Sequence, residues 1–210
     1  MVTLARAVAV AAAVALALAA CTCPHAPPRP EGCGVKVVEW GALPGLGYSV
    51  MDEPYWRCDA EWCDVKADDP PPGVDVAAVE ARIAAFADAA HAAGKKAWVN
   101  LSYPEVNWLA SGKIVVPLSV DRLSFDFYKG RCHWDEYRLH AYWLGWASGG
   151  RQTAMVVENE TNTIGLAVEY ACSHGQDLVV VWPGLNCQSR PPYACQEGPA
   201  ITAGYPGART

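Results

Sequence analysis

Acidic side chains recur where short apolar stretches of this chain come to an end. Such side chains matter chemically, because one carboxyl group can donate a proton while a second stays ionised and acts as nucleophile or base. The stretches concerned are residues 48–51, 123–127 and 154–157. The acids at or just beyond their ends are Asp52, Glu53, Asp126, Glu158 and Glu160. We treat these five acids as candidates for one shared site.

Side chains that suit a ligand stand near the same places. The chain has 9 Trp and 9 Tyr against 3 Phe. A Trp or Tyr ring offers an apolar face for stacking and a polar edge for hydrogen bonds, a combination that suits a sugar ring. The candidates for ligand contact are Asp52, Trp56, Asn100, Tyr103, Trp108, Tyr128, Glu160 and Trp182. The aromatic residues Tyr137, Tyr142, Trp143 and Trp146 are expected to pack a helix onto the sheet instead.

The elements that must position these residues are short strands alternating with helices. Apolar stretches rich in β-branched and aromatic residues predict strands at 35–40, 48–51, 97–101, 123–127, 154–157 and 178–182. Continuous apolar stretches of this length are typical of parallel strands that are buried on both faces. Strands alternating with helices indicate βαβ units and therefore an α/β fold.

Three helices are predicted between the strands. The first begins after Asp75 as N-cap, and its apolar face follows the helical spacing of Val76, Val79 and Ile83 before Gly94 ends it. The others are predicted at 135–147 and 163–174. In a fold of this kind the functional loops leave from the carboxyl ends of the parallel strands, so the candidate residues are expected to converge there.

Four motifs resemble the glycoside-hydrolase-type TIM barrels: "YSVMDEPYW", "GKKAWVNLSYPE", "RLSFDFY" and "AMVVENE". The resemblance runs from about Gly47 to Trp182 and implies a (β/α) barrel with a carbohydrate-active site. A full eight-fold barrel needs about 250 residues. Only six strands are predicted here, so we expect a barrel-like fold that is shortened or incomplete.

Glycoside hydrolysis uses two carboxyl groups, and the best pair is Glu53 with Glu158. Asp126 is assigned as a third acid that holds one of them or a sugar hydroxyl. Asp52 and Glu53 are neighbours on an extended chain, so only one of them can face the site from within the strand. Asp52 has an alternative role in capping, and Glu160 has one in the first turn of the following helix.

The first 20 residues have the layout of an export signal. Arg6 precedes an apolar segment of Ala, Val and Leu, which ends in Leu-Ala-Ala before Cys21. This ending resembles the bacterial lipoprotein box and predicts lipidation of Cys21. The alternative is an ordinary signal-peptidase site with Cys21 in a disulfide. We divide the chain into a signal peptide (1–20), a Pro-rich tether (21–32) and one barrel-like domain (33–210).

Export would place the cysteines in an oxidising compartment, where disulfides persist. There are 9 cysteines, and short loops make Cys58–Cys63 and Cys187–Cys195 plausible pairs, although the sequence cannot fix the connectivity. Zinc is disfavoured, because no Cys-x2-Cys motif is accompanied by a matching His pair. No metal or other cofactor is expected, since phosphate-loop, dinucleotide and His-Glu-x-x-His motifs are absent from the sequence. A net charge of −6 disfavours binding to nucleic acid.

Two functions of different classes follow from these observations. The first is an envelope-anchored glycoside hydrolase that uses two carboxylates and meets the membrane only through its lipid, in the periplasm or at the cell surface. The second is a non-catalytic lipoprotein that keeps the barrel-like scaffold and binds glycan or a protein partner. A purely structural envelope protein is disfavoured, because it has no use for acids at successive strand ends.

Overall fold

The computed structural model describes residues 32–55, 68–126, 134–159 and 161–182. Within them one sheet of six parallel strands has the order β1-β6-β5-β4-β3-β2. Each predicted strand is present. The strands are β1 (Lys36–Glu39), β2 (Tyr48–Asp52), β3 (Lys96–Leu101), β4 (Arg122–Asp126), β5 (Gln152–Glu158) and β6 (Leu178–Trp182).

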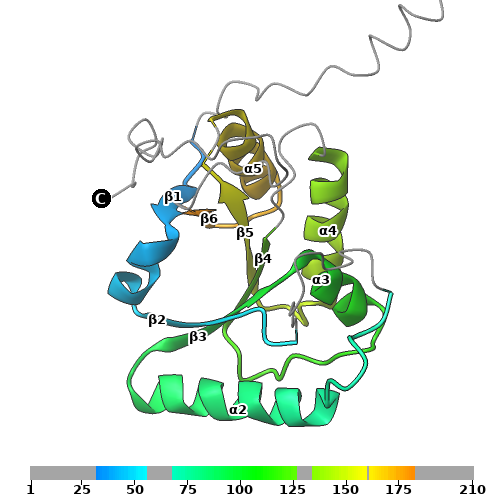
Figure 1. The fold of residues 1–210 in the computed structure, drawn as a ribbon. Coiled ribbons are helices and arrows are strands. Elements are labelled where there is room, and N and C mark those ends of the chain that lie inside the picture. Colours follow the sequence, from blue (N-terminus) through cyan, green and yellow to red (C-terminus); the bar gives the residue numbers. More distant parts are fainter. Residues whose placement is uncertain (1–31, 56–67, 127–133, 160, 183–210) are drawn as a thin grey trace, which may run out of the picture.

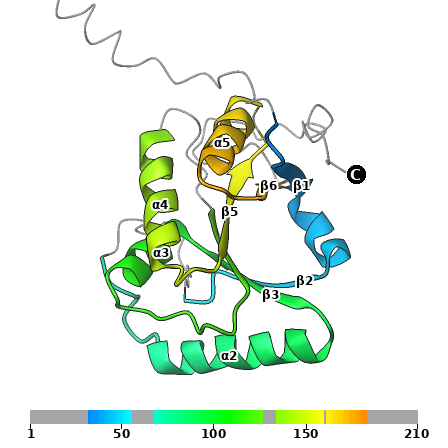
Figure 2. The same ribbon diagram turned by 180° about the vertical axis from the view of Figure 1, so that it is seen from behind.

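The sheet curls into an open half-barrel, so the expected α/β class and the expected shortening are both confirmed (Figures 1 and 2). β1 and β2 are consecutive in the chain but lie at opposite edges of the sheet. A 3-10 helix, η1 (Trp40–Leu46), connects them and also contacts β6. The left-handed backbone of Gly47, with φ 85°, then turns the chain into β2.

Four α-helices cover the convex face of the sheet. They are α2 (Val76–Ala92), α3 (Tyr103–Ala110), α4 (Trp134–Ala147) and α5 (Thr161–Ser173). Each helix contacts two neighbouring strands, from β2 and β3 under α2 to β5 and β6 under α5. Figure 1 shows the helices following one another around the outside of the curled sheet.

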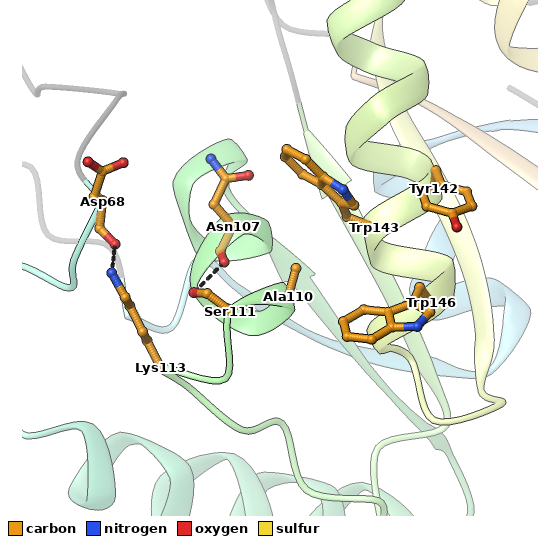
Figure 3. Close-up of a pocket in the computed structure, with 8 residues that line it drawn as sticks. All are labelled: Asp68, Asn107, Ala110, Ser111, Lys113, Tyr142, Trp143 and Trp146. Carbon is orange, nitrogen blue, oxygen red and sulfur yellow. Dashed lines mark hydrogen bonds between the residues drawn. The ribbon is translucent and has the colours of Figure 1, made fainter.

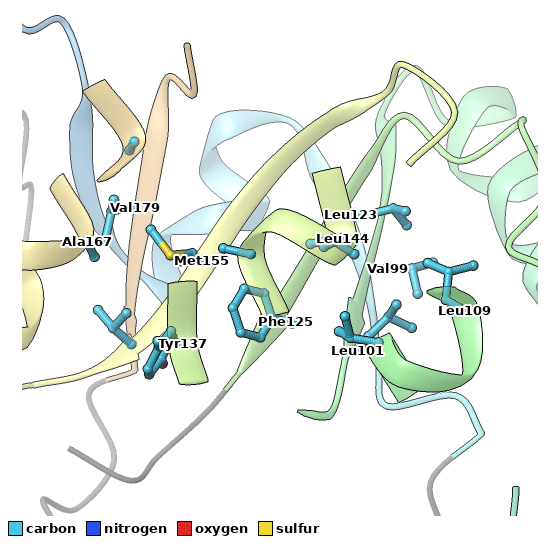
Figure 4. Packing of buried hydrophobic residues seen from close by; sticks show 14 of the residues in the cluster. Val99, Leu101, Leu109, Leu123, Phe125, Tyr137, Leu144, Met155, Ala167 and Val179 are labelled. Carbon is cyan, nitrogen blue, oxygen red and sulfur yellow. The ribbon is translucent and has the colours of Figure 1, made fainter. Parts of the chain in front are cut away.

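Alternate residues of each strand serve two separate cores. Residues such as Val99, Phe125 and Met155 point outward and pack against the helices (Figure 4). Their neighbours Trp98 and Val156 point inward, where they meet Leu43 of η1 in a second cluster. Both faces of the sheet are therefore buried, which explains why the strands read as continuous apolar stretches rather than as alternating patterns.

The helix after Asp75 forms for the reasons its sequence indicates. Asp75 Oδ1 accepts a hydrogen bond of 3.0 Å from the backbone N–H of Ala78, which satisfies one free donor of the first turn. Val79 and Ile83 are buried against the sheet. Gly94, with φ 69°, follows the C-cap in the left-handed region. The helices predicted at 135–147 and 163–174 are also present, with ends shifted by one or two residues.

α3 was not predicted, although its N-terminus carries a signature. Ser102 and Glu105 form a capping-box sequence, and the Ser102 N–H donates to Glu105 Oε2 at 2.6 Å. Pro104 lies in the first turn, where it breaks no helical hydrogen bond. The helix has only eight residues, so its apolar period is too short to stand out in the sequence.

A disulfide joins Cys33, just before β1, to Cys172 in α5, with a Cα–Cα distance of 5.7 Å. Sequence reasoning did not single out this pair, which is separated by 139 residues. The proposed pairs Cys58–Cys63 and Cys187–Cys195 lie outside the described residues, as does Cys21. No helix within the described ranges is long and apolar enough to cross a membrane.

Candidate functional site

The carboxyl ends of β2, β3 and β4 are joined on the concave face by a chain of side-chain hydrogen bonds. Asp52, Asn100 and Ser124 are register partners across these strands. The Trp98 indole N–H donates to Ser124 Oγ at 2.6 Å, and Ser124 Oγ donates to Asn100 Oδ1 at 2.6 Å. The Asn100 amide in turn donates to Asp52 Oδ1 at 2.8 Å. The network fixes the orientation of an exposed carboxylate at the mouth of the half-barrel.

Asp126 and Glu158 lie further along the same concave face. Asp126 lies two residues after Ser124 in β4, so its side chain points to the same face. Val156 of β5 is the register partner of Asp126 and points inward, and Glu158, two residues further along β5, points the same way. Both carboxyl groups are largely buried, with 9% and 7% of the residue surface exposed. Thr163 of α5 donates to Glu158 Oε1 at 3.4 Å. Two carboxyl groups therefore share one strand-end face with Asp52.

A pair of tryptophans forms the β1 and β6 side of this face. Trp182 is the register partner of Glu158 at the end of β6. Its ring centroid lies 5.1 Å from that of Trp40, the first residue of η1, and both side chains are half-buried. Trp182 was predicted as a ligand contact. Trp40 was not, because in the sequence it only ends the apolar stretch 35–40.

Glu53 occupies the first position after β2 in an unusual conformation. Its φ is 38°, in the left-handed region that residues other than glycine rarely adopt, and its N–H donates to the Asn100 carbonyl at 2.9 Å. Burial, followed by the charge of Asp52, raises the pKa of Glu53 to about 7. Backbone strain and a shifted carboxyl pKa both cluster at functional sites.

Glu105 of α3 holds the loop that follows β2. Its side chain is fully buried, and its two oxygens accept hydrogen bonds of 2.6 Å from the backbone N–H groups of Tyr55 and Ser102. Burial, assisted by the charge of Glu53, raises the pKa of Glu105 to about 8, although these hydrogen bonds act in the opposite direction. Sequence reasoning missed Glu105, and the capping-box spacing after Ser102 is the signal that could have found it.

Further contacts secure the same loop. The Arg82 guanidinium of α2 donates to the Pro54 carbonyl at 2.6 Å, and the Tyr55 hydroxyl donates to the Val115 carbonyl at 2.9 Å. Tyr55 is fully buried. The Asp-Glu-Pro-Tyr segment is thus bonded to α2, α3 and the segment after α3. The packing of these elements therefore fixes the position of Glu53.

The opposite end of the concave face is closed by Arg122. Its guanidinium pairs with Asp177 at 2.8 Å and lies over the rings of Trp98 and Tyr48, at 5.1 and 5.6 Å from their centroids. Arg122 is 1% exposed. The concave face therefore ends in a packed cation at the amino ends of the strands, and its acids stand at the carboxyl ends.

Not every predicted contact residue belongs to this face. Tyr103 begins α3 and packs on His140 of α4, with ring centroids 4.2 Å apart, so it lies in the helical layer. Trp108, also expected at the site, is fully buried in the outer core. Trp56, Tyr128 and Glu160 lie outside the described residues. The structure thus brings Asp52, Asn100, Asp126, Glu158 and Trp182 to one face, and Glu53 follows Asp52 directly after the end of β2.

The expectation for the aromatics of α4 was half right. Tyr137 is fully buried, and its hydroxyl donates to the Val156 carbonyl at 2.8 Å. Tyr142 and Trp146 are instead 62% and 70% exposed. They were predicted to pack on the sheet because the helix is aromatic all round, which hides its inward face from a sequence pattern.

Within the described ranges, no three His, Cys, Asp or Glu side chains are grouped so that they could hold a metal ion. The chain matches none of the protein-family models, curated proteins or solved structures with which it was compared.

Proposed function

We propose that the concave face at the carboxyl ends of the strands binds carbohydrate and hydrolyses a glycosidic bond. The observation that carries the proposal is Glu53, a strained residue at the rim of the acidic face whose pKa is raised to about 7. A carboxyl group that keeps its proton near neutral pH can protonate the departing glycosidic oxygen. Glu158 supplies the second carboxylate, which either attacks the anomeric carbon, to be released by water, or takes a proton from the water that attacks it, and Asp126 positions Glu158 or a sugar hydroxyl.

The network on β2, β3 and β4 supports the binding half of this proposal. Asp52 is held by Asn100, so its carboxylate can accept hydrogen bonds from sugar hydroxyls without first being ordered. Trp182 and Trp40 present half-buried rings on the other side of the same face. Fixed acceptors opposite an aromatic surface match the alternation of hydroxyl groups and C–H faces on a sugar ring.

The experiment is a turnover screen of the full chain on a glycan panel, with Glu53→Gln and Glu158→Gln compared with wild type. Each variant keeps the shape of the side chain but removes the ionisable group, so each is expected to reduce kcat by at least a hundredfold. Asp88→Asn, an exposed change on α2, is the control and should retain activity. A wild-type chain that cleaves no glycan contradicts the hydrolase.

One observation favours the non-catalytic alternative. Burial comes first among the causes of the raised pKa of Glu53, and structural hydrogen bonds to Glu105 hold the loop that buries it, so packing of the loop accounts for the raised pKa without a catalytic role. In that case the same screen gives glycan binding without turnover, and Glu53→Gln leaves the affinity unchanged. This outcome identifies a glycan-binding lipoprotein on the same scaffold.

Anchoring in the envelope through a lipid on Cys21 is part of the proposal and rests on the sequence 18–21. Replacing Cys21 by Ala removes the thiol that would carry the lipid. The variant is expected to leave the membrane fraction and to appear as a soluble or unprocessed chain on fractionation of the expressing cells. Unchanged membrane association of the variant contradicts lipidation.

A further inference from the structure

A second concave surface lies in the helical layer, between α3 and α4 (Figure 3). It is an open pocket with a volume of about 750 Å³, within the size range of small-molecule sites. Asn107 and Ala110 of α3 form one wall, and Trp143 and Trp146 of α4 form the other. These residues come from the later parts of their helices, which run back toward the amino ends of the strands, so the pocket is separate from the acidic face.

The α4 wall is an exposed aromatic surface. Trp146 is 70% exposed and Trp143 is half-buried, and Figure 3 shows both indole rings projecting from α4 toward the last turn of α3. Tyr142 also lines the pocket and is 62% exposed. Large aromatic side chains left in contact with water on a concave surface are typical of binding sites. The small side chain of Ala110 leaves space opposite the indoles.

The α3 wall carries a polar atom without a partner. Asn107 Oδ1 is buried and accepts no hydrogen bond from the residues that the structure describes. Figure 3 shows the Asn107 side chain extending along the pocket toward Trp143. A buried acceptor that has no donor destabilises the folded chain by about 1–3 kcal/mol. Because Asn107 as a residue is only half-buried, rotation of its side chain would bring this oxygen to a ligand hydroxyl placed against Trp143, which supplies the missing donor.

The positive charge on the rim is neutralised by Asp69, which does not line the pocket, so the remaining charge of the lining is the Asp68 carboxylate. Lys113 lies 2.7 Å from the Asp69 carboxylate and donates to the Asp68 carbonyl at 2.6 Å. The lining contains one basic and one acidic residue, Lys113 and Asp68. An anionic ligand would therefore meet a like charge at Asp68, whereas the hydroxyl groups of a neutral sugar can donate to that carboxylate.

We infer that this pocket binds a neutral sugar unit of a polysaccharide, stacked on Trp143 and Trp146 and hydrogen-bonded to Asn107. A sugar ring has the required combination of an apolar C–H face and hydroxyl donors at its edge. The inference does not depend on hydrolysis at the strand ends. It gives the protein a second carbohydrate contact, between α3 and α4 of the helical layer.

Titration calorimetry of the full chain tests the inference with three neutral hexasaccharides, of β-1,4-linked glucose, β-1,4-linked N-acetylglucosamine and α-1,4-linked glucose. All titrations use a Glu53→Gln background, in which cleavage at the strand ends is not expected. We expect at least one sugar to bind and Trp146→Ala to weaken that binding about tenfold or more. Leu139→Ala is the matched control, because Leu139 is 45% exposed on the same helix but does not line the pocket.

Asn107→Ala gives a readout that a purely structural role would not produce. The change removes an acceptor without a partner and places a better helix former in α3, so the melting temperature should stay equal or rise. Binding of the sugar should nevertheless weaken. Ala110→Leu should also weaken binding, because it fills the space opposite the indoles.

Three results overturn the inference. The first is that none of the hexasaccharides binds. The second is that a sugar binds but keeps its affinity in both Trp146→Ala and Asn107→Ala. The third is that the wild-type chain is a dimer by analytical ultracentrifugation and Trp146→Ala is a monomer, which assigns the surface to a second copy of the chain. The hydrolase proposal is decided separately by turnover of the chain that retains Glu53.

Discussion

At the scale of single residues, Glu53 and Glu105 form the most unusual pair in the described structure. Both carry carboxyl groups whose pKa is raised, to about 7 and about 8, and each is raised first by burial. Their surroundings nevertheless differ. Glu105 is enclosed and bonded to two backbone N–H groups, whereas Glu53 stands at the rim beside Asp52. Glu105 therefore positions the loop after β2 through its hydrogen bonds, whereas Glu53 remains available for proton transfer.

The first prediction concerns the pH dependence of turnover. If Glu53 donates the proton, it must be protonated in the free enzyme, so kcat/KM should be maintained below pH 7 and fall as the pH rises through about 7. The measurement is kcat/KM against pH on the best substrate of the panel. Asp88→Asn should keep the profile, while an alkaline limb displaced by two units or more removes Glu53 from this role.

The second prediction concerns stability and Glu105. The folded chain holds this proton up to a pKa of about 8, whereas the ordinary value is 4.5, so stability is greatest at low pH and declines as the pH rises between these values. Glu105→Gln cannot ionise, but it keeps only one acceptor oxygen for the two N–H groups and loses about 1–3 kcal/mol. Its deficit relative to wild type should therefore shrink from pH 5 to pH 9.

Urea unfolding of both proteins at several pH values measures this difference. Glu53 contributes in the same direction and remains in the variant, so part of the decline should persist. A deficit of Glu105→Gln that stays constant from pH 5 to pH 9 would show that Glu105 is already ionised in the folded chain at pH 5.

At the scale of elements, the strands were predictable from sequence and the site was only partly so. A strand that is buried on both faces must be apolar throughout. Each of the six strands can therefore be recognised in the sequence as a short apolar stretch such as 178–182. The same continuity hides which residues face inward. In β2 the side chain of Asp52, rather than that of Glu53, points to the concave face. The hydrogen bond from Asn100 to Asp52 shows this, whereas the sequence pattern does not.

Short helices and exposed aromatics account for the remaining errors. α3 begins directly after β3, so in the sequence Tyr103 and Trp108 stand close after a strand end like ligand contacts, whereas helical geometry turns Trp108 into the outer core. In α4, aromatic residues occupy every face, and packing rather than spacing decides that Tyr137 is buried and Trp146 exposed. A sequence pattern reports periodicity, and neither helix has one that distinguishes its faces.

The third prediction concerns the network across β2, β3 and β4. Asn100 is 1% exposed and bonds both Asp52 and Ser124. Asn100→Ala removes both bonds and should destabilise the chain by about 1–3 kcal/mol. It should also speed amide hydrogen exchange at Glu53, whose N–H pairs with the Asn100 carbonyl at the edge of the sheet. Asn107→Ala is the matched control, and equal stability of the two variants contradicts a structural role for the network.

At the scale of the whole molecule, β1 forms one edge of the open half-barrel. β1 is an edge strand that pairs only with β6 among the described strands, and η1 spans the space between β1 and β2. The Cys33–Cys172 disulfide fastens the start of β1 to α5, which packs on β5 and β6. The disulfide therefore joins β1, the first of the described strands, to α5 and through it to β5 and β6.

The last prediction concerns this disulfide. It closes a loop with a sequence separation of 139 residues, and a bond across a long loop restricts the unfolded chain strongly. The double variant Cys33→Ala and Cys172→Ala should lose about 2–4 kcal/mol of unfolding free energy in urea without reductant. Hydrogen exchange should rise first in β1, because without the disulfide the described residues attach this strand to the sheet only through β6 and η1. A double variant with the wild-type urea midpoint and unchanged exchange in Val37 and Val38 would show that packing against η1 and β6 holds the edge unaided.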